Sequence, residues 1–174
     1  MKKFTMYQYR QKFEFKRPPR NISYPDGNPL ILSNEFSFFH NKNKFRKELN
    51  RLQFLFKDYT DNPLTAAGIR DSYLKEEFSE EFFIILFTTN EIVRKTNQIV
   101  EKFIKTEYVP GCFYLESTSD YILLITKDMD GLIYGIDILE EIFTQTFEDY
   151  LKQGAFEDYV KVRPFLIHNC GIVD

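Results

Sequence analysis

The chain has 174 residues, of which 43% are hydrophobic and 28% charged, and its net charge is −3 at pH 7. These values are typical of one globular domain with a buried core and exclude a disordered chain. The small net charge gives no strong field to attract nucleic acid, and no apolar run approaches the roughly 18 residues of a membrane span, so neither partner is expected.

Charge is unevenly distributed along the chain. Residues 1–20 carry seven basic side chains and one acid, whereas residues 137–158 carry seven acids and one lysine. A basic N-terminal arm can contact phosphates or an acidic polysaccharide, although a solvated segment is the simpler interpretation. Its loosely alternating aromatic residues, from Phe4 to Phe15, suit an edge strand or an extended arm. They could also stack on sugar rings, but half-buried packing is the commoner role.

The first half of the chain contains two clear patterns. Pro18-Pro19 excludes a central strand or a helix at that point, so residues 1–20 are expected to form an extended arm. After a turn at 24–29, a strand is expected from Leu30 towards Phe39. A helix is predicted over 43–59, because apolar residues recur there in steps of four and three: Phe45, Leu49, Leu52, Phe56 and Tyr59. Residues 64–80 give no clear pattern.

The second half is easier to interpret. The apolar run 82–87 predicts a strand covered on both faces, or nearly so, and a helix is expected over 91–106. Strands at 112–117 and 121–126 flank a turn and form a predicted hairpin. A helix from about Gly131 to Phe147 follows, with Asp130 placed to cap it. A last strand is expected over 158–163, before Pro164.

This order of elements predicts an α+β fold, a mixed β-sheet with helices packed on one face. The expected organisation is an N-terminal extended arm over 1–20, one α+β domain over 21–164, and a further segment over 165–174.

The sequence contains none of the standard catalytic or metal-binding motifs. The only histidines, His40 and His168, stand alone and favour structural roles, and no Cys-x-x-Cys pair indicates zinc. The sequence Asp128-Met129-Asp130-Gly131 starts like a calcium loop, but the twelfth residue, where an acid is required, is Leu139. Neighbouring acids such as Glu140-Glu141 point in different directions on a helix and read as solvated faces. No catalytic residue, metal or cofactor is therefore expected.

Cys112 and Cys170 are the only cysteines. They can pair if the fold brings them together, but reduced core residues are the expectation from sequence. The N-terminus lacks the apolar run of a signal peptide, which predicts a cytoplasmic protein, or a secreted one if an upstream signal has been removed. Asn21-Ile22-Ser23 fits the glycosylation pattern, which would be unused without secretion.

Residues 108–147 resemble the accessory domain that precedes the catalytic barrel in glycoside hydrolase families 20, 84 and 67. The match lies in the strand at Pro110-Gly111, the strand at 121–125, and the turn and helix start formed by Asp128, Asp130, Gly131, Tyr134 and Gly135. We expect the two helical glycines to let the helix lie close against the sheet, with Tyr134 filling the space beside them. Residues 160–165 resemble the family's final strand, and residues 169–174, with Gly171 and Asp174, resemble its barrel entry, most like family 84. The resemblance therefore implies that residues 165–174 are the start of a catalytic barrel whose remainder is absent from this chain.

The resemblance implies a zincin-like accessory-domain sandwich that supports a β-N-acetylglucosaminidase or hyaluronidase-type barrel and catalyses nothing itself. The acidic pair of those enzymes belongs to the barrel, so no catalytic residue transfers to this chain. The expected partner is that barrel, and an exposed apolar patch near the last strand would favour a homodimer. The alternative is a stand-alone domain that binds glycan or protein.

Overall fold

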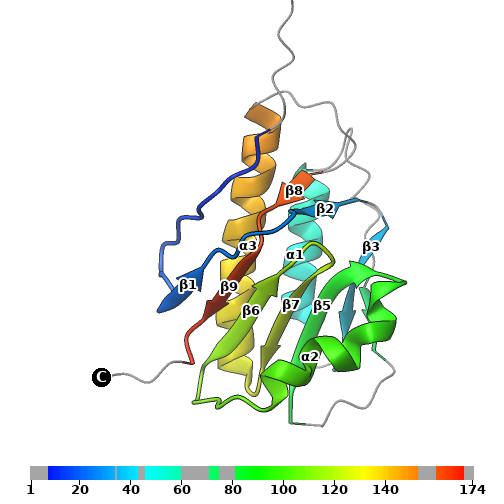
Figure 1. The fold of residues 1–174 in the computed structure, drawn as a ribbon, viewed down its shortest axis with the longest axis vertical. Helices are drawn as coiled ribbons and strands as arrows, with labels where there is room; N and C mark the ends of the chain where they lie inside the picture. Colours follow the sequence, from blue (N-terminus) through cyan, green and yellow to red (C-terminus); the bar gives the residue numbers. More distant parts are fainter. Residues whose placement is uncertain are drawn as a thin grey trace, which may run out of the picture.

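The computed structural model describes residues 8–33, 35–42, 46–59, 71–74, 81–152 and 160–170 (Figure 1). Within them the protein is an α+β fold with one seven-stranded and one two-stranded sheet, which confirms the predicted class. None of the described helices combines the length and apolar character needed to cross a membrane. The elements in chain order are β1 (Asn21–Ser23), β2 (Leu30–Leu32), β3 (Phe36–His40), α1 (Arg46–Tyr59), β4 (Asp71–Tyr73), β5 (Phe83–Thr89), η3 (Ile92–Lys95), α2 (Thr96–Ile104), β6 (Phe113–Ser117), β7 (Tyr121–Thr126), α3 (Met129–Lys152), β8 (Val160–Val162) and β9 (Phe165–His168).

The large sheet has the strand order β1-β9-β6-β7-β5-β3-β4. Its neighbours are antiparallel except for the parallel pair β3–β4, so the sheet is mixed, as predicted. The predicted hairpin is β6–β7, and the backbone amide of Thr118 closes its turn by donating to the carbonyl of Tyr121 at 2.9 Å. Alternate side chains along these strands point to opposite faces, so each face has its own core.

The two longer helices, α1 and α3, run side by side over one face of the sheet (Figure 1). Three residues of the predicted helical stripe of α1 are confirmed, since Leu49, Leu52 and Phe56 are fully buried. Phe45 and the side chain of Tyr59, its other two members, lie outside what the structure describes. Phe56 lies at the centre of this layer, with ring centroids 4.8 Å from Phe143 and 5.1 Å from Phe147 on α3. At the outer edge, the Arg51 guanidinium bonds both carboxylate oxygens of Glu140, at 2.8 and 2.9 Å, and the pKa of Arg51 is raised chiefly by this contact.

The short helix α2 lies on the opposite face, which corrects the expectation of helices on one face alone. Val100 and Phe103 of α2 share a buried cluster with Ile84 and Leu86 of β5, whereas Ile85 belongs to the cluster under α1 and α3. The physical reason is the apolar run of β5, which is buried on both sides and therefore needs a layer on each side.

The chain around Pro164 departs from prediction. Residues 165–168, expected to leave the domain, form β9, which pairs with β1 on one side and β6 on the other. The expected boundary between residues 164 and 165 therefore falls between β8 of the small sheet and β9 of the large sheet, so it does not mark the end of the domain. The last predicted strand is β8, which pairs only with β2 in the small sheet. The strand expected over 30–39 likewise divides into β2 and β3, which belong to different sheets.

The described part of the N-terminal arm, residues 8–20, contains no helix or strand and runs along α3 (Figure 1). Arg10 forms a two-pronged ion pair with Asp149 at 2.8 and 3.0 Å. The side chains of Gln145 and Glu141 then bond main-chain groups of Glu14 and Lys16. The described part of the basic arm is thus fastened to the acidic segment by one ion pair and by hydrogen bonds to its main chain. Phe13 is buried against Phe165, so this aromatic residue packs into the core and offers no platform for a sugar.

Candidate functional site

The segment that carries the family resemblance begins α3. Because the helix starts at Met129, the capping residue is Asp128, which corrects the expectation of Asp130. One oxygen of Asp128 accepts from the amide of Gly131 at 2.7 Å, and the other accepts from the amide of Gly111 at 2.8 Å. A single carboxylate therefore caps the helix and fastens the loop before β6 to it. Asp130 is exposed on the first turn.

Replacing Asp128 with alanine should lower the free energy of unfolding by about 1 to 2 kcal/mol, because one cap and one loop contact are lost together. Asp130→Ala on the same turn should change it by less than about 0.5 kcal/mol. Urea unfolding of both variants measures the difference. Equal effects would mean that Asp128 is not the capping residue.

The two glycines of α3 meet the hairpin directly, as expected. A Cβ atom built on Gly131 would lie 2.2 Å from Oγ1 of Thr126 and 2.4 Å from the carbonyl oxygen of Cys112. A Cβ atom built on Gly135 would lie 2.4 Å from a methyl carbon of Leu124. Gly131 therefore lacks room for a side chain while the helix stays in place, and at Gly135 the Leu124 side chain would have to move to make room.

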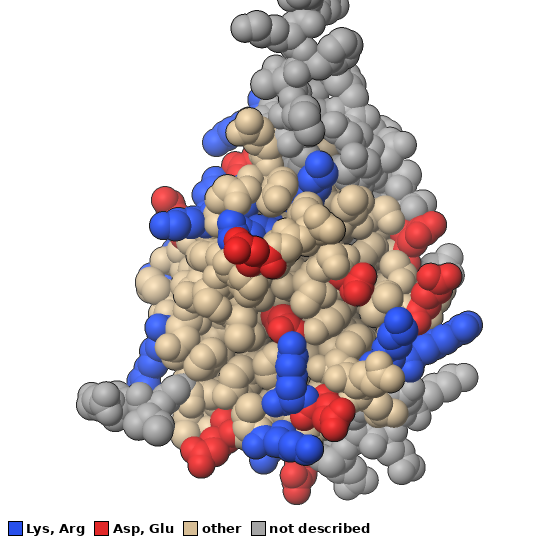
Figure 2. Space-filling view, viewed as in Figure 1, with Lys and Arg blue, Asp and Glu red and all other residues tan. Residues whose placement is uncertain are grey.

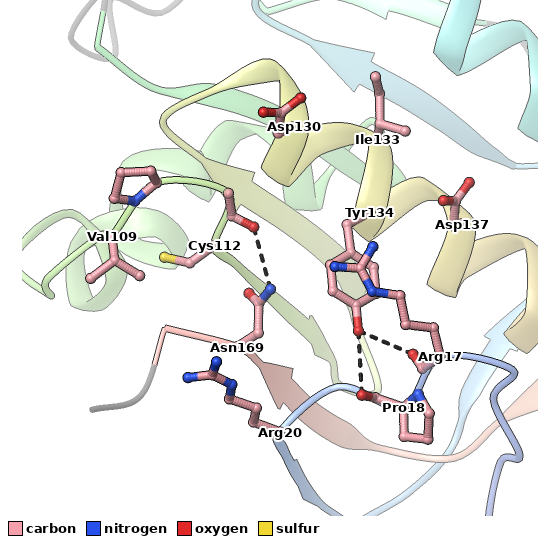
Figure 3. A pocket seen from close by; sticks show the side chains of 12 residues that line it. Arg17, Pro18, Arg20, Val109, Cys112, Asp130, Ile133, Tyr134, Asp137 and Asn169 are labelled. Atoms are coloured by element: carbon pink, nitrogen blue, oxygen red, sulfur yellow. Dashed lines mark hydrogen bonds between the residues drawn. The ribbon is translucent and has the colours of Figure 1, made fainter. Parts of the chain in front are cut away.

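Tyr134, between these glycines, joins the helix to the arm. Its ring packs edge-on against Phe113, with centroids 5.2 Å apart, and the Arg17 guanidinium lies 4.0 Å from the ring centre. Its hydroxyl donates towards the carbonyl oxygens of Arg17 and Pro18 at 3.0 and 3.3 Å (Figure 3). Burial raises the pKa of this hydroxyl, which keeps it protonated as a donor.

A cleft of about 970 Å³ opens beside Tyr134 (Figure 3). The arm forms one wall with Arg17 and Arg20, and α3 forms another with Asp130, Ile133 and Asp137. The loop before β6 contributes Val109, Pro110, Gly111 and Cys112, and Asn169 completes the lining. Val109 and Ile133 are 47% and 36% exposed, so the cleft joins apolar and charged surface.

Two acids line this cleft, and both come from α3. Asp130 and Asp137 are two helical turns apart, which separates their Cα atoms by about 10 Å along the axis. Asp137 is also bonded to Arg51 at 2.5 Å. Neither histidine lines the cleft.

The two histidines have structural surroundings, as the sequence suggested. Nδ1 of the buried His40 lies 3.0 Å from the carbonyl oxygen of Lys42. His168 stacks on Tyr114, with centroids 5.0 Å apart, on the sheet face beside α2. Figure 2 views this side of the molecule, where acidic and basic side chains are scattered over a mostly uncharged surface, near its middle as well as around its rim.

Stability should fall as the pH drops through the titration of His168. Burial lowers the pKa of His168, so the unfolded chain binds a proton at a pH where the folded chain does not. The free energy of unfolding should therefore decrease between about pH 7 and pH 5. In urea titrations, the His168→Gln variant should lose less free energy of unfolding over the same pH interval. A variant with the same slope as the parent would contradict this assignment.

Cys112 and Cys170 form a disulfide, which corrects the expectation of reduced cysteines. The antiparallel pairing of β6 with β9 brings together the residues that precede β6 and follow β9. Asn169 strengthens this junction: its Oδ1 accepts from the amide of Phe113 at 2.8 Å, and its Nδ2 donates to the carbonyl of Gly111 at 3.3 Å. Two cysteines with no local spacing motif gave no signal of this pairing.

Gly171 and Asp174, the barrel-entry residues, lie outside the described residues. Within the described part of the chain, no group of three or more His, Cys, Asp or Glu is placed to hold a metal ion.

Comparison of the chain with family models, curated proteins and solved structures finds no match.

Proposed function

We propose that this chain is a non-catalytic accessory domain of a β-N-acetylglucosaminidase-like glycoside hydrolase, supporting a separate catalytic barrel. One observation carries the proposal: the residues of the family-like segment serve packing. Asp128 caps α3, Gly131 and Gly135 seat it on the hairpin, and Tyr134 holds the arm. A motif whose residues fit one helix to one sheet indicates a scaffold.

The electrostatics of the described residues also support a scaffold. Acidic side chains on the outer face of α3 are committed to ion pairs, Asp149 with Arg10 and Glu140 with Arg51. On the face of the large sheet that α2 covers, Glu116 accepts hydrogen bonds from Lys102 and from the hydroxyl of Tyr121. Each of these carboxylates is engaged by a neighbouring cation, and none of the three lines the cleft beside Tyr134.

The proposal is tested in two steps. The purified chain should not turn over a chromogenic N-acetylglucosaminide. A barrel encoded downstream of codon 174 or by a neighbouring gene should co-purify with the chain and gain thermal stability from it. Turnover that persists through re-purification and is lost on substitution of Asp130 or Asp137 would overturn the proposal. A barrel that is equally stable and active without the chain would do the same.

A second function, binding of an acidic glycan, is favoured by the cations of the cleft. Arg17 and Arg20 are exposed there, and neither has a carboxylate partner among the described residues. Guanidinium groups suit uronic acid carboxylates. Calorimetric titration with hyaluronan oligosaccharides should give heat that the double substitution Arg17→Ala and Arg20→Ala removes, and that Lys12→Ala leaves unchanged. No heat at millimolar ligand would exclude this function.

A further inference from the structure

The disulfide closes a large and well-defined part of the fold. Cys112 and Cys170 are 58 residues apart, and the segment between them contains β6, β7, α3, β8 and β9. They are the only cysteines of the chain, so the thiol chemistry of the whole protein is concentrated here. Every element of the family-like segment lies inside the closed loop.

The surroundings of the bridge are ordered and buried. Cys112 is 1% exposed and Cys170 is 8% exposed. The carbonyl of Cys112 accepts from the hydroxyl of Thr126 at 2.6 Å, which ties the first half-cystine to the end of β7. The backbone amide of Asn169 donates to the carbonyl of Phe113 at 3.4 Å, and its side chain bonds Phe113 and Gly111, which ties the second half-cystine to β6.

We infer that this chain matures in an oxidising compartment, where formation of the Cys112–Cys170 bridge fixes β9 between β1 and β6. Protein disulfides persist in such compartments and are rare where glutathione and thioredoxin keep thiols reduced. The native bridge is buried, so exchange with an external disulfide must occur before or during the docking of β9. This inference is independent of the proposed accessory function.

The step balances as thiol–disulfide exchange with a disulfide oxidoreductase. The thiolate of Cys170, the more exposed cysteine, attacks a sulfur of the oxidised partner; a mixed disulfide forms and one partner thiolate leaves. The thiolate of Cys112 then attacks the Cys170 sulfur, the bridge forms, and the second partner thiolate leaves. The cysteine pair loses two electrons and two protons, and the partner disulfide becomes a dithiol.

The test compares the chain exported to a bacterial periplasm with the same chain produced in a reducing cytosol. The exported protein, denatured without reductant, should contain no alkylatable thiol and should be lighter by two hydrogen atoms. Reductant should lower its Tm by roughly 4 to 20 °C. Amide exchange in β9 and β1 should rise at least about tenfold in the reduced protein.

The double variant Cys112→Ala and Cys170→Ala is the matched control, since its Tm should not respond to reductant. In Cys112→Ala alone, Cys170 should be trapped as a mixed disulfide with the oxidoreductase, and Cys170→Ala should be trapped less. Two free thiols in the exported protein would overturn the inference. An unchanged Tm and unchanged exchange in β9 after complete reduction of the wild-type chain would also overturn it.

Discussion

Adding one methyl group at Gly131 is expected to lower the free energy of unfolding by about 3 kcal/mol, near the upper end for overpacking a tight contact. The new Cβ would overlap Oγ1 of Thr126 and the carbonyl oxygen of Cys112. The carbonyl is backbone and cannot turn away, and the clash also disturbs the 2.6 Å hydrogen bond between these two groups. The start of α3 must therefore lift off the hairpin.

Packing and helix propensity predict opposite signs for the change in the free energy of unfolding: tight packing predicts a loss, and helix propensity alone predicts a gain. At an exposed helix position, glycine to alanine would stabilise the helix by up to about 1 kcal/mol. Gly135→Ala should cost about 1 to 2 kcal/mol, less than Gly131→Ala, because its obstacle is the end of the Leu124 side chain. Urea unfolding of both variants, with the exposed Ile133→Ala as control, measures the order. A stabilised Gly131→Ala variant would show that α3 does not sit on the hairpin.

Replacing Phe56 with alanine should lower the free energy of unfolding by about 3 to 5 kcal/mol. The ring is fully buried and lies 5.5 Å from Phe38 and 5.6 Å from Phe87, in addition to its contacts with α3. It therefore joins the sheet to both helices, and its removal leaves a cavity bounded by three elements. Large-to-small substitutions of this kind are costly because the surrounding rings cannot collapse fully into the space.

The same helix supplies the control. Phe54 lies two residues earlier on α1 and is 64% exposed, so Phe54→Ala should change the free energy of unfolding by less than about 0.5 kcal/mol. Both variants remove the same atoms from the same helix, and only burial differs. Chemical denaturation with matched m-values is the measurement. Similar losses for the two variants would contradict the packing of α1 described above.

The sequence predicted those parts of the fold whose signal is local. The stripe containing Leu49, Leu52 and Phe56 identified α1, and the turn after Ser117 identified the hairpin. The contact between the helical glycines and the hairpin was anticipated because only a glycine permits so close an approach.

Non-local features were missed because no short pattern carries them. The cap was assigned to Asp130 because helix ends are uncertain by one or two residues, and the structure places it at Asp128. The partner of β9 and the Cys112–Cys170 pair depend on which strands become neighbours. The cleft combines the arm, α3 and the end of β9, which are distant in sequence. Alternation and turn residues contain no information about such neighbours.

Because β9 fills the position between β1 and β6, a ribosome must deliver almost the whole described chain before the large sheet can close. Asn21 pairs with His168, so β1 emerges early and waits for β9, its neighbour among the described strands, until residue 168 has been synthesised. Such distant pairings slow folding and leave strand edges open for longer. Nascent chains stalled before residue 165 should therefore be good clients for chaperones that bind extended segments.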